Sequence, residues 1–407
     1  MEHKKILIIG GGVAGLSAAL ALEQLGIKAS IVEKTGFLGG HAIQYACKAT
    51  DQCVKCGACV VEEKLKAVAE NPDIRIFLNS QIKNKAQNNG RSVITLHCQP
   101  PYIDPHKCTD CGQCYAQCPG KGAIEQGFSP NNHPLYALNA DKCLRFTGQD
   151  CHICEDVCPE KAIDLNQQPY KHICEINAVI VASGFKAFEP VDKPYGWQVF
   201  DNVVTNLELE RMLRRQSIAV RPSDGQIARC IAFIQCVGSR DATLNHLWCS
   251  KVCCGSALRM ARVIKTRHPE SEITFFYMDV QNSGKDFEKF YAAVQNDIHE
   301  IRCLPGDVYQ TSDGSLQVSH FDRHDRQSVE HIFDLVVLSV GITPGSDTGE
   351  LADCLQLKPE PTGFFSASPT QLGIFTAGAA AGPMTIEDAI ASAGQAVWQT
   401  VQYLKTC

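Results

Sequence analysis

A glycine motif between an apolar strand and a helix constrains the fold of this chain more than any other feature. Residues 5–10, KILIIG, form an apolar run typical of a buried parallel strand. The sequence GGGVAGLSAALALEQLG then places Gly10, Gly12 and Gly15 in G-x-G-x-x-G spacing ahead of apolar residues at helical period. Such glycines allow a tight turn and let backbone N–H groups approach a pyrophosphate at the helix N-terminus. The pattern predicts a dinucleotide-binding βαβ unit.

A second strand and an acidic residue follow at the expected distances. The helical pattern ends at Gly26, a typical helix C-cap residue, and IKASIVEK forms the next expected strand. Glu33 lies 18 residues beyond Gly15 in this strand, close to the spacing of a carboxylate that binds a ribose hydroxyl.

Three later segments resemble the flavin segments of FAD-dependent disulfide-reductase-type proteins. GFLGG (36–40) follows the acidic residue, AVIVASG (178–184) resembles their strand-plus-glycine segment, and residues 373–397 resemble their C-terminal flavin segment. The resemblance implies FAD rather than NAD, with a second helix N-terminus facing the isoalloxazine. The FAD-binding residues expected from all these segments are Gly10, Gly12, Gly15, Glu33, Lys34, Gly39, Gly40, Ser183, Gly184, Gly378, Pro383, Met384 and Thr385.

Cysteine is unusually frequent, with 22 residues in 407. Disulfide scaffolds are usually far shorter exported chains, so clustered Cys-x-x-Cys spacing favours metal sites, with disulfides as the alternative. The net charge of −6 gives no footprint for nucleic acid. No uncharged apolar segment approaches the roughly 20 residues that cross a bilayer.

Two cysteine runs between the flavin segments have ferredoxin spacing. CTDCGQCYAQCP is C-x2-C-x2-C-x3-C-P, and CLRFTGQDCHICEDVCP differs in its longer first gap. In two-cluster ferredoxins the fourth cysteine of each run serves the other cluster. Zinc is the alternative, which the trailing Cys-Pro pairs disfavour. We expect one 4Fe–4S cluster on Cys108, Cys111, Cys114 and Cys158, and a second on Cys118, Cys143, Cys151 and Cys154.

An earlier run, CKATDQCVKCGACV, has the spacing C-x5-C-x2-C-x2-C and no trailing proline. A fourth cluster could be held by its four cysteines, Cys47, Cys53, Cys56 and Cys59. The alternatives are a zinc site, or free thiols with Cys98 as a rival ligand.

A second βαβ pattern begins at Cys230. CIAFIQCVGS is the expected strand, CCGSALRMARVIKTRHP the helix and EITFFYMDV the next strand. The glycine fingerprint of a nicotinamide-binding unit is missing, and four cysteines stand in its place: Cys236, Cys249, Cys253 and Cys254. A helix N-terminus favours thiolates. We expect a 4Fe–4S cluster in place of NAD(P)H; a redox dithiol or a packed cysteine pair is the alternative.

This second pattern resembles the A subunit of heterodisulfide reductase. The strand, CVGSRD, twelve residues between Cys236 and Cys249, and then C-x3-C-C carry the resemblance. FDNVVTNLELERML (200–213), RPSDG (221–225) and GKDFEKFY (284–291) are similar as well. The related A subunit of the quinone-interacting membrane-bound oxidoreductase complex shares these features. The resemblance covers nearly the whole chain.

The resemblance implies an oxidoreductase subunit whose FAD exchanges electrons with 4Fe–4S clusters, including flavin-based electron bifurcation or confurcation. Arg259 stands where the family often carries a lysine close to the flavin. A guanidinium cannot donate a proton, although it still stabilises a reduced anionic flavin.

The resemblance also implies a cytoplasmic complex, with partner subunits bringing it to the inner face of the membrane. Expected partners are B- and C-type iron–sulfur subunits of either complex, a donor such as a hydrogenase, formate dehydrogenase or ferredoxin, and a second copy of the chain in a homodimer. Two other functions remain open. One is a stand-alone NAD(P)H-dependent reductase that exchanges electrons with a ferredoxin, and the other is a zinc-stabilised assembly scaffold.

The expected fold is α/β, a thioredoxin-reductase-like pair of Rossmann-type domains with an inserted two-cluster ferredoxin domain of α+β class. The first part of the FAD-binding domain spans residues 1–100 and includes the cysteine-rich segment 47–59. The remaining divisions are the ferredoxin domain at 101–170, FAD-binding parts at 171–228 and 334–407, and the second dinucleotide-type domain at 229–333.

Overall fold

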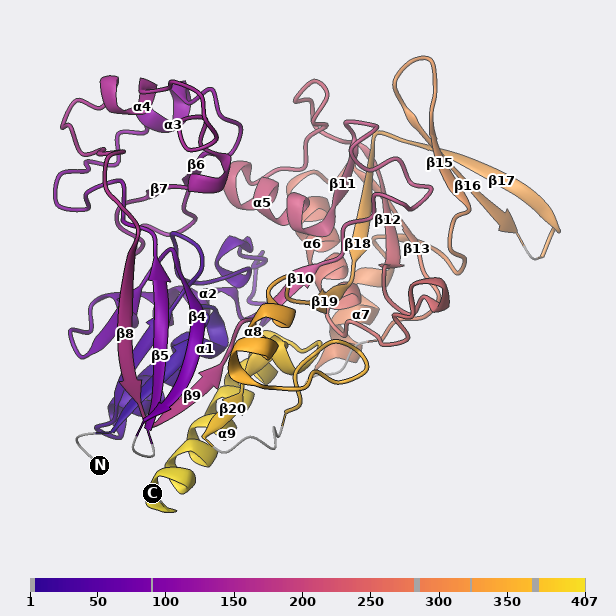
Figure 1. The fold of residues 1–407 in the computed structure, drawn as a ribbon. Helices are drawn as coiled ribbons and strands as arrows, with labels where there is room; N and C mark the ends of the chain where they lie inside the picture. The colour runs from indigo at the N-terminus through magenta and orange to yellow at the C-terminus, as the bar shows by residue number, and fades with distance from the viewer. Residues whose placement is uncertain (1–3, 89–90, 282–285, 323, 368–372, 407) are drawn as a thin grey trace.

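The computed structural model describes residues 4–88, 91–281, 286–322, 324–367 and 373–406. Gly284 and Lys285, which begin the GKDFEKFY motif, lie outside these residues. Two five-stranded parallel sheets form the two halves of the molecule (Figure 1). The strands of the first sheet, in spatial order, are β20 (Ile374–Thr376), β9 (Ala178–Val181), β1 (Lys5–Ile9), β2 (Lys28–Val32) and β3 (Ile74–Phe77).

Both faces of the first sheet are buried, which explains why β1 is apolar at every position after Lys5. Ile6 and Ile8 pack against one set of helices, while Leu7 and Ile9 pack into a separate core on the other face. Strands covered on both sides lose the alternation of polar and apolar residues. The helices of the first core are α1 (Val13–Gln24), α2 (Ala58–Ala69) and α9 (Ile386–Thr406). The opposite core contains α8 (Thr348–Leu355) and the antiparallel strands β4 (Ser80–Asn88), β5 (Arg91–Cys98) and β8 (Tyr170–Ile176).

The second sheet repeats this plan. Its strands, in spatial order, are β11 (Val203–Thr205), β18 (Leu335–Val340), β12 (Cys230–Val237), β13 (Glu272–Phe276) and β14 (His299–Ile301). Three helices contribute to one core: α5 (Asn206–Gln216), α6 (Cys253–Arg267) and α7 (Phe287–Gln295). The other core includes residues of the antiparallel strands β15 (Asp307–Gln310), β16 (Leu316–Asp322) and β17 (Gln327–Phe333).

The cysteine-rich insert lies between β5 and β8 and forms a small unit with its own core. That core includes Cys114, Cys143 and Cys154 beside aromatic and aliphatic residues. Its elements are α3 (Gln113–Gln117), β6 (Ile124–Gln126), β7 (Tyr136–Leu138), the short helix η2 (Ala140–Lys142) and α4 (Ile153–Asp156). An antiparallel pair, β10 (Phe185–Ala187) with β19 (Ile342–Pro344), lies where the chain passes between the two halves (Figure 1). The remaining elements are η1 (Ala42–Gln44), η3 (Ala242–Leu244) and η4 (Gly378–Ala381).

The sheets divide the chain differently from the expected domain boundaries at two places. Residues 203–216 and 335–340 were assigned to FAD-binding parts, but the structure builds them into the second sheet and its helical layer. β18 pairs in parallel with both β11 and β12. Chain order could not reveal this, because the second sheet takes strands from both sides of segment 229–333.

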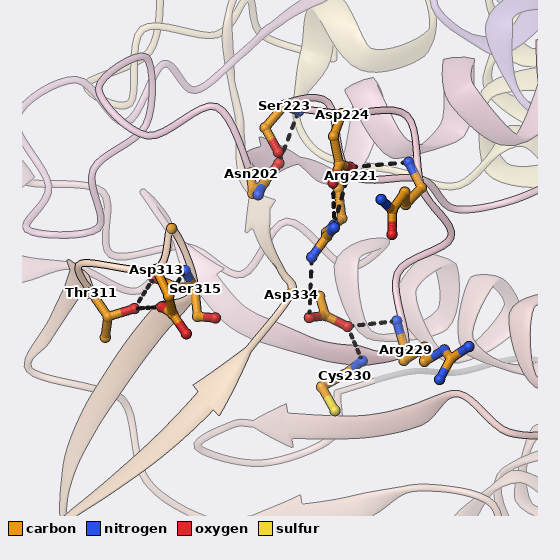
Figure 2. A network of polar contacts seen from close by, with 12 residues as sticks. Asn202, Arg221, Ser223, Asp224, Arg229, Cys230, Thr311, Asp313, Ser315 and Asp334 are labelled. Atoms are coloured by element: carbon orange, nitrogen blue, oxygen red, sulfur yellow. Dashed lines mark hydrogen bonds and ion pairs between the residues drawn. The ribbon is translucent and has the colours of Figure 1, made fainter.

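The RPSDG motif joins the strand starts of the second sheet (Figure 2). One Asp334 carboxylate oxygen accepts the backbone N–H groups of Arg229 at 2.8 Å and Cys230 at 3.0 Å. The other lies 3.8 Å from a guanidinium nitrogen of Arg221, which also pairs with Asp224. These contacts hold β12 and β18 in register at their amino ends. Parallel α/β sheets hold ligands beyond their carboxyl ends, so this network has a structural role.

Among the described residues, no helix combines the length and the apolar character that a bilayer crossing requires.

Candidate functional site

The glycine loop lies between β1 and α1, and close packing accounts for two of its glycines. Gly10 has a φ of +104°, and a Cβ there would lie 2.2 Å from the carbonyl oxygen of Ala182. A Cβ on Gly15 would lie 1.9 Å from the carbonyl oxygen of Gly10. A side chain on Gly10 would therefore push β1 away from the end of β9, and one on Gly15 would force strand and helix apart.

Gly12 has a different role because it faces open space. It is the N-cap of α1, where no side chain caps the helix and no acidic residue occupies the first turn. The nearest atom to an ideal Cβ on Gly12 is the Cα of Gly40, 4.0 Å away. The free N–H groups of α1 thus face a space that an anion could fill.

A cavity of about 850 Å³ extends from this loop and is large enough for a dinucleotide cofactor. Most of the expected FAD-binding residues line it, whereas three do not. Gly15 and Gly378 serve close packing, since a Cβ on Gly378 would lie 2.5 Å from that of Ala14. Pro383 is also absent from the lining. The residues that do line it are Gly10, Gly12, Glu33, Lys34, Gly39, Gly40, Ser183, Gly184, Met384 and Thr385.

Glu33 lies buried at the end of β2, with both carboxylate oxygens held by neighbours. Oε2 accepts the backbone N–H of Gly11 at 2.8 Å. Oε1 accepts the backbone N–H and the hydroxyl of Thr35, both at 2.9 Å. The carboxylate is therefore fixed at the cavity wall beside the glycine loop, as a ribose-binding role would require.

His41 and Arg211 also line the cavity, although the sequence patterns gave neither of them a role. The His41 ring stacks on Phe185 with centroids 4.4 Å apart, and its Nε2 lies 3.1 Å from the Phe185 carbonyl oxygen. Its Nδ1 is buried without a hydrogen-bond partner, and burial lowers the pKa of the imidazole. Arg211 donates from Nε to Gln44 at 2.6 Å. The unpartnered ring nitrogen and the open helix end both fit a polar cofactor such as FAD. The one available signal was indirect, namely that Arg211 lies within the family-like segment 200–213.

In the ferredoxin insert, the cysteines gather into two rings with the expected exchange of fourth members. One small pocket is lined by Cys108, Cys111, Cys114 and Cys158. A second small pocket is lined by Cys118, Cys143, Cys151 and Cys154. Burial raises the pKa of the Cys114 thiol to about 11 and that of Cys154 to about 12. A positively charged iron centre would offset this cost of deprotonation.

A third ring occupies the carboxyl end of β12 and the N-terminus of α6. A small pocket there is lined by the four cysteines of the second βαβ pattern, Cys236, Cys249, Cys253 and Cys254. The loop that closes it is braced by a 2.5 Å bond between the Ser239 and Ser250 hydroxyls. Burial raises the pKa of Cys236 to about 11 and raises that of Cys253 further.

This third ring adjoins the large cavity. The Cys253 thiol lies 3.6 Å from the Val340 carbonyl oxygen, and Val340 lines the cavity. Val252, which directly precedes Cys253, lines the cavity as well. A single layer of protein therefore separates a cofactor in the cavity from a cluster in the ring.

The spacing of the cysteines fits clusters better than single metal ions. In the described part of the chain, no three His, Cys, Asp or Glu side chains lie close enough to share one ion. A tetrahedral zinc with four thiolates brings its sulfurs to about 3.8 Å of one another, given Zn–S bonds of about 2.3 Å. Four thiols that line one pocket without converging on a single point are instead suited to a group with several iron atoms.

Arg259, expected near the flavin, does not line the cavity: its Nε donates to the Val54 carbonyl at 3.3 Å and its guanidinium lies over the Phe290 ring. Its side chain leaves α6 toward segment 47–59. In that segment, Cys47, Cys53 and Cys59 are exposed and Cys56 is half-buried.

Comparisons with known proteins agree with these features. Residues 5–88 match the family of FAD-dependent oxidoreductases, and residues 100–124 match a 4Fe–4S binding domain. The chain therefore contains an FAD-binding and a 4Fe–4S binding part, as the sequence predicted.

Among solved structures, thioredoxin reductase from T. acidophilum has a TM-score of 0.56 at 12% identity, with 99% of each chain covered. Lactococcus lactis thioredoxin reductase has the same score at 11% identity, covering 99% of this chain and 100% of that one. The expected thioredoxin-reductase-like fold is confirmed.

Curated relatives extend across nearly the whole chain. The iron–sulfur A subunit of CoB–CoM heterodisulfide reductase from Methanocaldococcus jannaschii is 36% identical over 96% of this chain and 63% of its own length. The A subunit of the H₂:CoB–CoM heterodisulfide,ferredoxin reductase from Methanothermobacter marburgensis is 34% identical over 96% of this chain and 62% of its length. The chain thus spans a little over three fifths of these relatives. The expected resemblance to the A subunits of heterodisulfide reductase is therefore confirmed over nearly the whole chain.

Proposed function

We propose that this chain is the FAD and iron–sulfur electron-transfer subunit of a heterodisulfide-reductase-like complex. The observation that carries the proposal is the contact between the large cavity and the third cysteine ring. Val252 and Val340 belong to the wall of the cavity, while Cys253 lies against that wall from the other side. Electron exchange between a flavin and a cluster requires such proximity.

The residues of the cavity fit FAD in charge and shape. The open N-terminus of α1 and Gly12 would hold the pyrophosphate, and Glu33 would bind a ribose. FAD, when bound, supplies conversion between two-electron and one-electron chemistry, and each cluster would carry single electrons. Because Arg259 lies elsewhere, we assign to Arg211 and Lys186 the role of favouring a reduced anionic flavin.

The third ring replaces a nicotinamide site rather than accompanying one. In a Rossmann-type unit, the dinucleotide phosphates occupy the N-terminus of the helix that follows the first strand. Here Cys253 and Cys254 are the first residues of that helix, α6, and both are buried. A cluster and a pyrophosphate are both anionic, so placing them at one helix end in a low dielectric would be strongly unfavourable.

The wider assembly follows from homology alone. The relatives are named as subunits of heterodisulfide reductases, and some names add ferredoxin. We propose B- and C-type iron–sulfur partner subunits, a homodimer within the complex, and a hydrogenase, formate dehydrogenase or ferredoxin as donor. Flavin-based bifurcation is the mode of action that this assembly would support. A cytoplasmic location at the inner face of the membrane would then be set by the partners.

Stopped-flow absorbance on the anaerobically purified chain tests the proposal. Dithionite or a reduced ferredoxin should reduce the flavin, whereas NADH and NADPH should do so far below ordinary enzymatic rates of roughly 1–1,000 per second. Flavin reduction by NADH within that range would instead support a stand-alone reductase. A colourless protein that contains zinc and lacks acid-labile sulfide would support the scaffold.

A further inference from the structure

Segment 53–59 has the same local sequence pattern as a ferredoxin loop elsewhere in the chain. CVKCGAC (53–59) and CTDCGQC (108–114) both follow C-x2-C-G-x-C. The second loop supplies three of the four cysteines around the first ferredoxin void. The first loop lies outside the ferredoxin insert, directly before α2.

The two loops also share an unusual backbone conformation. The residue two positions after the first cysteine is left-handed in both, with φ of 50° at Lys55 and 54° at Asp110. The glycine after the second cysteine has φ of 76° in both, at Gly57 and Gly112. A helix begins at the next residue in each case, so Cys59 and Cys114 hold the same helical position.

The shared conformation directs a backbone N–H at sulfur. Lys55 donates its N–H to the Cys53 Sγ at 3.4 Å, and Asp110 donates to the Cys108 Sγ at 3.4 Å. A non-glycine residue in the left-handed region costs on the order of 1–3 kcal/mol and persists where a function needs it. Hydrogen bonds to cluster-bound sulfur are a known means of tuning an iron–sulfur site.

Three basic side chains contact the segment, and two of them have acidic partners. Arg259 donates to the Val54 carbonyl, and Arg262 forms an ion pair with Asp51 at 3.3 Å. Lys55, within the loop itself, pairs with Asp286 at 3.3 Å. The guanidinium groups come from α6, so the helix that begins with the third ring also supports this segment.

The segment lies directly behind the wall of the flavin cavity. A Cβ on Gly57 would lie 3.1 Å from the side chain of Ile386, and Ile386 lines the cavity. Tyr45, two residues before Cys47, lines it as well. In contrast to the buried Cys253 and Cys254, three of the four cysteines here are exposed.

We propose that Cys53, Cys56 and Cys59, with Cys47 as the fourth ligand, hold a further 4Fe–4S cluster that is an electron outlet from the flavin cavity to the surface. The outlet role rests on the proposed function, but the cluster itself does not. Its exposed position suits electron exchange with a partner protein, whereas the third ring lies inside the fold.

Iron and sulfide analysis of the anaerobic full-length chain, with EPR of the dithionite-reduced protein, tests the site. The wild-type chain should hold about 16 iron atoms in four clusters. Cys56→Ser should lose about four iron and four sulfide atoms, as should Cys111→Ser at the equivalent position of the ferredoxin loop. The double variant should lose about eight. Cys174→Ser, on β8 away from the rings, is the matched control and should lose none.

The outcomes distinguish a failure of the new cluster site from a failure of the proposed function. If Cys56→Ser keeps its iron while Cys111→Ser loses four atoms, the new site is overturned and the proposed function stands. If Cys111→Ser also keeps its iron, the ferredoxin clusters and the proposed function fail. Zinc in the wild-type chain that is lost in Cys56→Ser overturns the cluster. Cys53→Ser, at an exposed position, replaces Cys56→Ser if that variant does not fold. An unchanged iron content and EPR spectrum in Cys47→Ser would remove Cys47 as the fourth ligand.

Discussion

The two parallel sheets have equivalent strand orders, but they carry different residues in the loop that joins the central strand to the following helix. In the first sheet, β1 leads to α1 through residues 10–12, and the loop leaves helix N–H groups facing a cavity of about 850 Å³. In the second, β12 leads to α6 through residues 238–252, and four cysteines line only a small pocket. A helix N-terminus attracts anions in both cases. Under the proposed function, loop length and side chains, rather than topology, would decide whether a phosphate or a thiolate-bound cluster uses it.

The sharpest test of this comparison removes the cluster at α6 while FAD stays bound. Cys253→Ser should abolish the cluster at α6, with a loss of about four iron atoms, while FAD content stays near wild type. The reason is that the pyrophosphate site lies in the first sheet. Iron analysis and the flavin absorbance of the purified variant measure both quantities. Loss of FAD together with the iron would mean that the two loops are not separate sites.

Gly12→Asp is the reciprocal change. Gly12 has extended backbone geometry and no close neighbour, and aspartate is a favourable N-cap, so the fold should tolerate it. The added carboxylate would face the pyrophosphate and should weaken FAD binding by at least about tenfold, or about 1.4 kcal/mol. The iron content should not change. Gly12→Ser, which adds a neutral N-cap, is the control for cap and size. Equal FAD affinity in the aspartate variant and the wild type would contradict the phosphate role of α1.

A buried ion pair joins the two sheets, and its loss should destabilise the whole chain. The Lys48 Nζ lies 2.7 Å from Glu210 on α5, and both side chains are almost fully buried. Glu210 also accepts the Ala46 N–H at 3.1 Å and the Ser256 hydroxyl at 3.0 Å. Glu210→Gln would leave the lysine charge unpaired and should cost about 3–5 kcal/mol of unfolding free energy. Urea unfolding of the anaerobic protein measures it.

The double variant Lys48→Met/Glu210→Gln is the informative control for that pair. It removes the charge as well as its partner, so most of the lost stability should return. A double variant as unstable as Glu210→Gln would show that the hydrogen bonds to Ala46 and Ser256, rather than the charge pair, hold the sheets together.

The smallest expected effect is on the pH dependence of stability, and it concerns His41 in the wall of the large cavity. Burial lowers its pKa in the folded chain below the unfolded value of about 6.5, so the unfolded state binds more protons below that pH. Stability should therefore fall as pH drops from about 6.5 toward the folded pKa, by at most about 1.4 kcal/mol per pH unit. His41→Phe, which keeps the stack on Phe185, should flatten this part of the profile. Melting temperatures at pH 5.5 and 7.5 test it, and an identical pH profile in the variant would contradict it.

Sequence spacing alone predicted which residues gather at each of these two β–α loops. The glycines of 10–15 and the cysteine intervals of 108–158 and 236–254 dictate which groups can meet, because each run is short and its backbone has little freedom. The exchange of Cys118 and Cys158 between rings was also predictable, since the run spacing implies it. The structure gathers these residues as the spacing predicted.

Tertiary structure decided what depends on contacts between distant segments. The direction of Arg259, the lining of the cavity by His41 and Arg211, and the Lys48–Glu210 pair all arise from packing between the two halves. The place of β18 in the second sheet has the same origin, because parallel strands can pair across any length of intervening chain. The spacing of residues along the chain determines which side chains can meet within one loop. Burial and pairing between distant segments determine which other residues those side chains contact.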